Sequence, residues 1–185
     1  MPVWEFAAIA GTAGTGRGSM IQFLSITVFP LLMIVAGVGD ALSMRIPNWL
    51  TTLIAVAFLP MALLTAMPLA DFGVHVAVGS GMFVLGFVLF SLRVFGGGDA
   101  KLLAAAGLWL GWPDLIPFLV MTAFAGGALG LAVGAWSLIN MNSEIKQGSI
   151  FNRFGTVKPS VPYGYAFAVG AILAFPDTWW MPVGG

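Results

Sequence analysis

Charged residues make up only 8% of the 185-residue sequence and hydrophobic residues make up 59%, whereas an ordinary soluble domain carries roughly 25% charged residues. So few charges cannot cover a water-exposed surface, and we expect an all-α, polytopic membrane protein. The seven basic and seven acidic residues balance each other, which excludes a basic nucleic-acid interface and an acidic tail. Cys is absent, which excludes disulfides, thiolate metal sites and a cysteine nucleophile.

Residues 1–19 precede the apolar part of the chain and include a glycine-rich run from Gly11 to Gly18. No basic region is followed there by an apolar core, so the segment is not typical of a signal peptide. We interpret it as a mobile N-terminal tail and residues 20–185 as a single transmembrane domain.

Charges and Pro/Gly clusters divide the remaining chain into six apolar segments, and a membrane-spanning helix needs roughly 20 such residues. The segments are approximately Met20–Leu42, Pro47–Met67, Phe72–Leu92, Ala100–Trp112, Leu115–Asn140 and Val161–Trp180. The fourth predicts a short helix, because from Asp99 to the helix-stopping Pro113 a helix extends only about 21 Å. Either the bilayer is thinner there, or the glycine turn before Asp99 lies below the membrane surface.

Three glycines in the fifth segment repeat at four-residue spacing: Gly126, Gly130 and Gly134. Small residues at this spacing let transmembrane helices approach each other closely. We therefore expect this stripe to pack against a neighbouring helix.

Six alternating spans would place nearly all the basic residues on one side of the membrane. The loops near 43–46, 93–101 and 141–160 contain six of the seven basic residues, namely Arg45, Arg93, Lys101, Lys146, Arg153 and Lys158. Because cytoplasmic loops are enriched in Lys and Arg, we predict that these loops are cytoplasmic and that both termini are periplasmic. The opposite loops carry Asp71, Asp114 and Asp177, which we interpret as helix caps or hydrated loop residues.

Two aspartates are candidate functional residues, because an ionisable group within a membrane span is costly. Asp40 lies near the end of the first segment, where the helix dipole disfavours a negative charge. The alternative is that the helix has already ended and Asp40 is a hydrated loop residue. Asp99 follows three glycines that leave room for an extended peptide, and the alternative is that Asp99 is the N-cap of the fourth helix.

The predicted topology places both aspartates at cytoplasmic helix ends, so we expect them to meet. Two carboxylates about 3 Å apart share one proton. The ionised member can take a proton from a water that attacks a peptide carbonyl, while the other donates a proton. This pattern predicts an aspartyl peptidase with no metal and no cofactor. The alternative is a small proton- or cation-coupled carrier, although its acidic residues would be expected near the bilayer centre and an inverted repeat is not evident.

Three motifs, in order, resemble those of the type IV prepilin peptidases, which are Gly-x-Gly-Asp (GxGD) membrane proteases. Asp40–Asn48 is similar to the first motif, with an aliphatic residue and a Pro at the sixth and seventh positions after Asp, and Gly96–Lys101 is similar to Gly-x-Gly-Asp-x-Lys. Pro162–Gly170 resembles the Pro-Tyr-Gly-x-Ala element. The resemblance implies that Asp40 and Asp99 are catalytic. It also implies cleavage of the leader of a prepilin or pseudopilin, just after a Gly, at the cytoplasmic face of the bacterial inner membrane.

The same motifs contain six further residues that we interpret as supporting the site or binding substrate: Gly96, Gly98, Lys101, Pro47, Tyr163 and Gly164. Three of these six residues can also be explained by a purely structural role. Lys101 is also explained by anchoring at the membrane surface and Tyr163 by an interfacial aromatic belt. Pro47 suits the start of the second helix. His75 is predicted to lie on the periplasmic side, remote from both aspartates and without the partners that a metal site needs.

Larger members of the family carry a cytoplasmic extension with paired Cys-x-x-Cys elements and also methylate the new N-terminus. Because this sequence has no Cys, it resembles the short, peptidase-only branch that serves tight-adherence (Flp-type) pili, and we expect no methyltransferase activity. Presenilin-type proteases share Gly-x-Gly-Asp, but their Tyr-Asp pair and Pro-Ala-Leu element do not occur here. The expected partners are a prepilin or pseudopilin and the lipid bilayer, without nucleic acid. The sequence makes no prediction of an oligomeric state.

Overall fold

The computed structural model describes residues 16–139, 163–178 and 180, and within these residues the chain is helical and contains no strand. The predicted all-α class is confirmed. The elements in order are α2 (Gly16–Ser43), α3 (Asn48–Leu64), α4 (Leu69–Ser91), α5 (Gly97–Ile139), α7 (Tyr163–Ala174) and the short 3-10 helix η1 (Phe175–Asp177). Residues 16–19 of the predicted tail belong to α2. Residues 1–15 and the predicted loop 141–160 lie outside the described residues.

Three of the described helices are long and apolar enough to cross a membrane: Phe23–Ser43, Leu69–Ser91 and Gly97–Trp136. The helices α3 and α7 are also apolar but shorter, with 17 and 12 residues. Large apolar side chains such as Phe87 and Leu131 are exposed on the outside of the bundle. Such exposure is expected where the surrounding solvent is hydrocarbon and not water.

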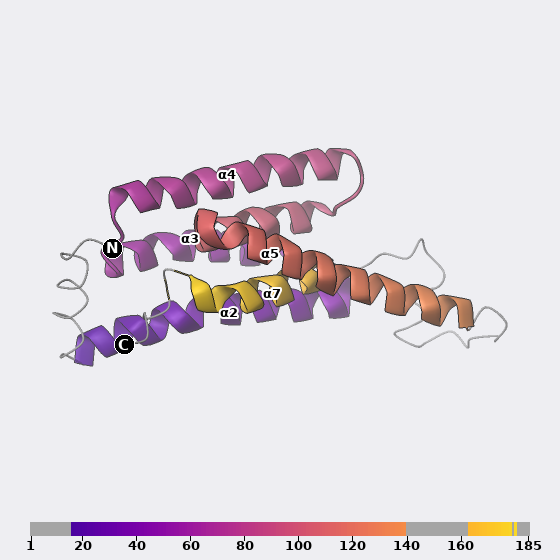
Figure 1. Cartoon of the computed structure of the whole chain (residues 1–185), viewed down its shortest axis with the longest axis horizontal. Helices are drawn as coiled ribbons and strands as arrows, with labels where there is room; N and C mark the ends of the chain where they lie inside the picture. The colour runs from indigo at the N-terminus through magenta and orange to yellow at the C-terminus, as the bar shows by residue number, and fades with distance from the viewer. Residues whose placement is uncertain (1–15, 140–162, 179, 181–185) are drawn as a thin grey trace.

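Helix α5 consists of two helical halves that are joined by a sharp break at Gly111. Gly111 has φ 71° and ψ −169°, a left-handed conformation that side-chain-bearing residues rarely adopt. Figure 1 shows the first half (97–110) running beneath α4, and the second half (112–139) turning back in the opposite direction. The predicted separation into a short fourth and a longer fifth helix is therefore present, but the fourth helix ends at Gly111 and not at Pro113.

Two aromatic side chains satisfy the backbone carbonyls that this break frees. Pro113 has no N–H to donate to the Trp109 carbonyl four residues earlier, and the Trp180 indole Nε1 donates to that oxygen at 2.6 Å. The His75 ring Nδ1 lies 2.8 Å from the Leu108 carbonyl oxygen, so it is the donor there. Unpaired carbonyls are costly away from water, and these two contacts stabilise the end of the short helix.

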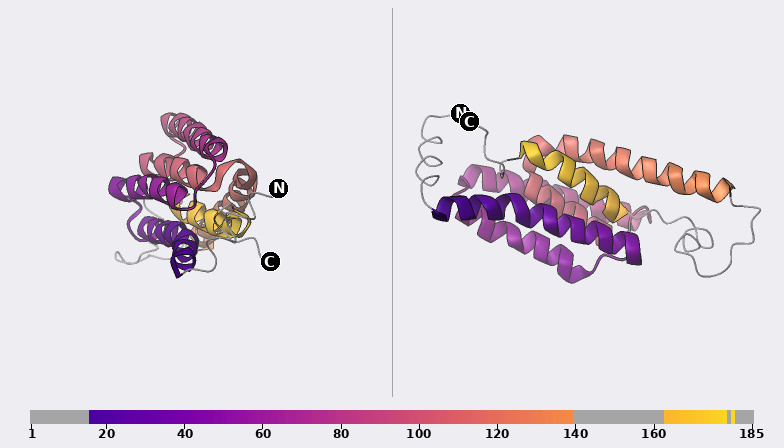
Figure 2. Two further views of the ribbon diagram at one scale, coloured as in Figure 1. Left: turned by 90° about the vertical axis from the view of Figure 1, so that its left-hand side faces the viewer. Right: turned by 90° about the horizontal axis from the view of Figure 1, so that it is seen from below.

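Successive helical segments run in alternating directions, which brings one end of each to the same place. At this end, on the right in Figure 1, α2 and α4 finish and α3, α5 and α7 begin. We call it the site end. Figure 2 shows α7 lying between α2 and the second half of α5, with which it makes extensive contacts. The first half of α5 is central, with Leu102, Leu103, Ala106 and Trp109 almost completely buried.

Glycines allow several helix pairs to approach closely. A Cβ atom at Gly37 of α2 would lie 2.6 Å from the Ala168 Cβ of α7, and one at Gly86 of α4 would lie 2.9 Å from the Ala100 Cα of α5. In the predicted stripe, a Cβ at Gly126 would lie 3.4 Å from the Ala166 Cβ, whereas one at Gly134 would have nothing within 4 Å. The glycine-mediated contacts therefore follow the arrangement of the helices and not a regular spacing.

We predict that Gly111→Ala destabilises the protein. The new Cβ would lie 2.8 Å from the His75 ring, and Ala would have to adopt φ 71°; such strain costs about 1–3 kcal/mol. Thermal unfolding of the purified protein in detergent measures the effect. Gly127→Ala on the same helix is the matched control, because its new Cβ would have nothing within 4 Å. Equal midpoints for both variants would contradict the role given to Gly111.

Candidate active site

Asp40 lies in the last turn of α2 with only 5% of its surface exposed. Its Oδ2 accepts a hydrogen bond of 2.8 Å from the backbone N–H of Gly164, and the Tyr165 backbone N–H also donates to this carboxylate. Both donors belong to the first turn of α7, where free N–H groups and the helix dipole favour a negative charge. The alternative of a hydrated loop residue is wrong, because Asp40 is helical and buried.

Asp99 is the third residue of α5, and its carboxylate turns back to the residue before the helix. Its Oδ2 accepts a hydrogen bond of 3.1 Å from the Gly96 backbone N–H. This is the reach-back half of a capping box, in which the third helical residue binds the N-cap N–H. Asp99 is therefore not itself the N-cap, because the helix begins at Gly97, three residues earlier than the alternative requires.

The two aspartates lie at the same end of the bundle and their carboxyl groups interact electrostatically. Ile46 lies between the segments that carry them. A Cβ atom at Gly98 would lie 3.0 Å from the Ile46 Cβ, and one at Gly164 would lie 2.7 Å from the Ile46 Cδ1. Through this side chain, which is only 9% exposed, the three sequence motifs meet.

Ile46 was not singled out by the sequence, although it is the aliphatic residue that precedes Pro47 in the first motif. Its contacts also explain two of the predicted supporting glycines. A side chain at Gly98 or Gly164 would overlap Ile46, and one at Gly164 would additionally lie 2.8 Å from the Asp40 Oδ2. Gly96 contributes differently, through the N–H that it donates to Asp99.

Lys101 faces α3 and not Asp99. Its Nζ donates a hydrogen bond of 2.8 Å to the Asn48 Oδ1, so the first turn of α5 is tied to the first residue of α3. Lys101 lies two residues after Asp99, which places it about 200° around the helix. Pro47 is the N-cap of α3, with φ −63° and ψ 136°, in agreement with its interpretation as a helix start.

Tyr163 begins α7 and packs against an aromatic residue that the sequence did not single out. Its ring centroid lies 4.9 Å from that of Phe95, which in turn lies 5.6 Å from Phe167. Phe95 immediately precedes the glycine turn. These ring contacts hold that turn against α7, and no local pattern in the sequence reveals them.

His75 is at the opposite end of the bundle from the aspartates, where its ring packs against Phe58 and lies near Gly111. Within the described part of the chain, no three His, Cys, Asp or Glu residues are arranged to hold a metal ion.

Comparison with known proteins identifies the family. The model of the type IV leader peptidase family matches residues 27–131, which include both aspartate motifs. The chain belongs to this family. It is thus an integral membrane protein of a peptidase family, as predicted. The match ends before α7, so the contact between Asp40 and Gly164 is an observation from the structure alone.

Curated relatives match over a shorter region. A prepilin leader peptidase/N-methyltransferase of Burkholderia pseudomallei strain 1026b is 47% identical over 49 residues, and so is its counterpart in strain K96243. The matched region covers 26% of this chain and 16% of each relative. No solved structure matches the chain.

We predict that Gly164→Ala strongly reduces any peptidase activity at this site, because its Cβ would displace the Asp40 carboxylate and Ile46. The matched control is Gly39→Ala, which is one residue from Asp40 but whose new Cβ would have nothing within 4 Å. Displacement of a catalytic group by about 1 Å costs roughly 100-fold in rate. The check is the rate of prepilin leader cleavage by the two purified variants, and equal rates would rule out the positioning role of Gly164.

Proposed function

We propose that this protein is an aspartic endopeptidase that removes the leader peptide of prepilins or pseudopilins at the cytoplasmic face of the bacterial inner membrane. The observation that carries the proposal is the meeting of Asp40, Gly98 and Gly164 around Ile46. Asp99 follows Gly98 directly, and its carboxyl group interacts electrostatically with that of Asp40. These residues come from the three motifs that resemble the family's motifs, and the family match covers the first two.

In the proposed reaction, the two carboxyl groups share one proton. One takes a proton from the attacking water and the other donates to the carbonyl oxygen or the leaving amine. The backbone N–H groups of Gly164 and Gly96 orient Asp40 and Asp99 respectively. The Gly96–Gly98 turn carries no side chains, which supports the approach of an extended peptide backbone to the carboxylates.

We also propose six membrane crossings with both termini in the periplasm. The reversal at Gly111 and the alternating directions of the helical segments support this number. Arg45, Arg93 and Lys101 are exposed at the site end, where the positive-inside bias favours the cytoplasm. The first half of α5 reaches only about 21 Å, so Asp99 would lie within the membrane boundary and not above it.

We propose that the protein cleaves the leader peptide and does not transfer a methyl group. The curated relatives carry both activities in their name, but this sequence has no Cys from which the paired Cys elements of the larger members could be built. We therefore place the chain with the short branch that serves tight-adherence pili.

We predict that Asp40→Asn and Asp99→Asn each abolish leader cleavage, because neither amide can take the proton from the attacking water or share one with its partner. The loss should exceed about 1,000-fold. Incubating each purified variant with a prepilin in detergent and following the mobility shift measures it. Asp71→Asn is the control, because Asp71 lies in the first turn of α4 at the other end of the bundle.

Full activity in either variant of the pair would overturn the two-aspartate mechanism. Thermal unfolding of both variants near the wild-type midpoint shows that lost activity is not lost folding. Proton uptake into liposomes without any cleavage would support the carrier in place of the peptidase.

The topology is directly testable, because the chain has no Cys and single Cys residues can be introduced. We expect Arg45→Cys and Arg93→Cys to react with a membrane-impermeant maleimide only after the inner membrane is opened. Ala66→Cys, in the turn between α3 and α4, should react in intact spheroplasts. The reverse pattern would contradict the proposed orientation.

A further inference from the structure

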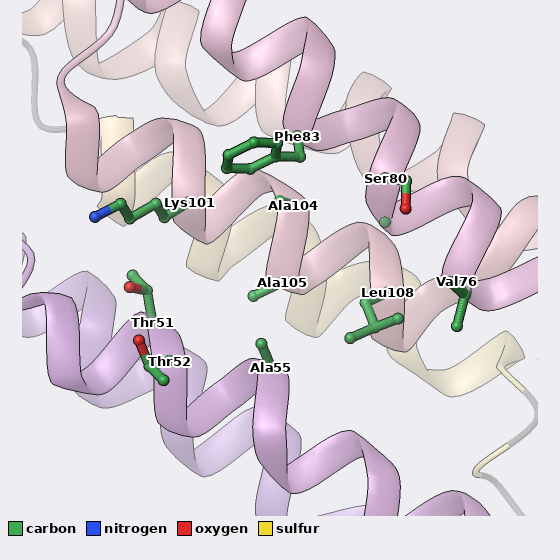
Figure 3. A pocket seen from close by; sticks show the side chains of 11 residues that line it. Thr51, Thr52, Ala55, Val76, Ser80, Phe83, Lys101, Ala104, Ala105 and Leu108 are labelled. Carbon is green, nitrogen blue, oxygen red and sulfur yellow. The ribbon is translucent and has the colours of Figure 1, made fainter.

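A groove of about 410 Å³ lies on the face of α5 that is turned away from Asp40. Its walls are α3 and α4, and its floor is the first half of α5 (Figure 3). Lys101 lies at its site end, and Leu108 and Val76 lie at its other end (Figure 3).

The groove exists because α3 and α4, although consecutive in the chain, meet only at the end that is far from the aspartates. There the Phe58 ring of α3 stacks on Phe72 at 5.7 Å and on His75 at 5.6 Å. Both helices pack on α5 and hardly on each other, which leaves the groove between them (Figure 3).

Most residues that line the groove are small or carry a hydroxyl group, as on surfaces against which transmembrane helices pack. Seven of its eleven lining residues are Ala, Gly, Ser or Thr: Thr51, Thr52, Ala55, Gly79, Ser80, Ala104 and Ala105. Transmembrane helices associate through such surfaces, because small side chains allow close approach and hydroxyls can donate across the contact. A lipid tail gains no such advantage, because it packs equally well against a surface of Leu and Ile.

We propose that this groove binds the apolar helix that follows the leader in the substrate. The inference rests on the proposed function and adds the place where the substrate's membrane segment docks. Lys101 lies about 200° around α5 from Asp99, so a chain that rises along the groove must cross the start of α5 to reach the carboxylates. Gly96 and Gly97, which are exposed and carry no side chain, form that crossing, whereas Ile46 fills the space beside Gly98.

The floor of the groove is long enough for about two turns of a helix, because it extends about 10 Å from Lys101 to Leu108. The groove opens outward between α3 and α4, so the outer side of the docked helix would face lipid.

Two variants fill the groove, Thr52→Leu and Ser80→Leu, and both positions are exposed lining residues. Each is assayed on a prepilin that contains its apolar helix and on a short soluble peptide that spans only the leader and the scissile bond. We expect kcat/KM for the prepilin, divided by kcat/KM for the short peptide, to fall about tenfold in each variant, equivalent to about 1.4 kcal/mol. Ala77→Leu, exposed on α4 outside the groove, is the matched control and should keep the wild-type ratio.

An unchanged ratio in both filling variants, or an equal loss of activity on both substrates, overturns the proposed docking in the groove. A wild-type protein that cleaves neither substrate overturns the proposed function instead. A second measurement does not depend on activity: Ser80→Cys combined with Asp99→Asn should form a disulfide with a Cys in the apolar helix of the bound prepilin, and Ala77→Cys should not. A groove that holds only lipid leaves Ser80→Cys unlinked, which also overturns the docking.

Discussion

The reversal of α5 at Gly111 is the constraint on which the rest of the structure depends. Without it, the second half of α5 would continue away from the site end, and the start of α7 would not return to Asp40. The break needs the left-handed φ of 71° at Gly111, and it frees carbonyls that His75 and Trp180 then satisfy. In lipid such carbonyls have no water to bind, so the aromatic cluster and the reversal stabilise each other.

Close approach of backbones explains how a small bundle forms an acidic site. Hydrocarbon provides little hydrophobic driving force between helices, so association depends on packing and hydrogen bonds. At Gly98 and Gly164 the absence of side chains lets Ile46 fill the space between two helix starts. The buried Asp40 carboxylate is then held by the N-terminus of α7, which compensates for its unfavourable place at the end of α2.

The first half of α5 has two faces with different chemistry. One carries Asp99 towards Asp40 and α7, and the other carries Lys101 towards Asn48 and the small-residue groove. Both faces belong to one short, mostly buried helix that begins at the glycine turn. A substrate that used the groove would therefore contact the same rigid element that holds one of the carboxylates.

The sequence by itself determined the membrane class and the helical segments and singled out the two aspartates as candidates, because these depend on composition and on residues close together along the chain. It also placed the fourth helix and its shortness, but it attributed the end to Pro113 and not to Gly111. It expected Gly134 to pack against a neighbouring helix, whereas a Cβ added there would have nothing within 4 Å. Only the tertiary structure decided that Gly164 binds Asp40, that Ile46 joins the three motifs and that Phe95 packs on Tyr163. These contacts link segments that are distant in sequence, and they depend on how each helix is placed and rotated in the bundle, which local patterns do not specify.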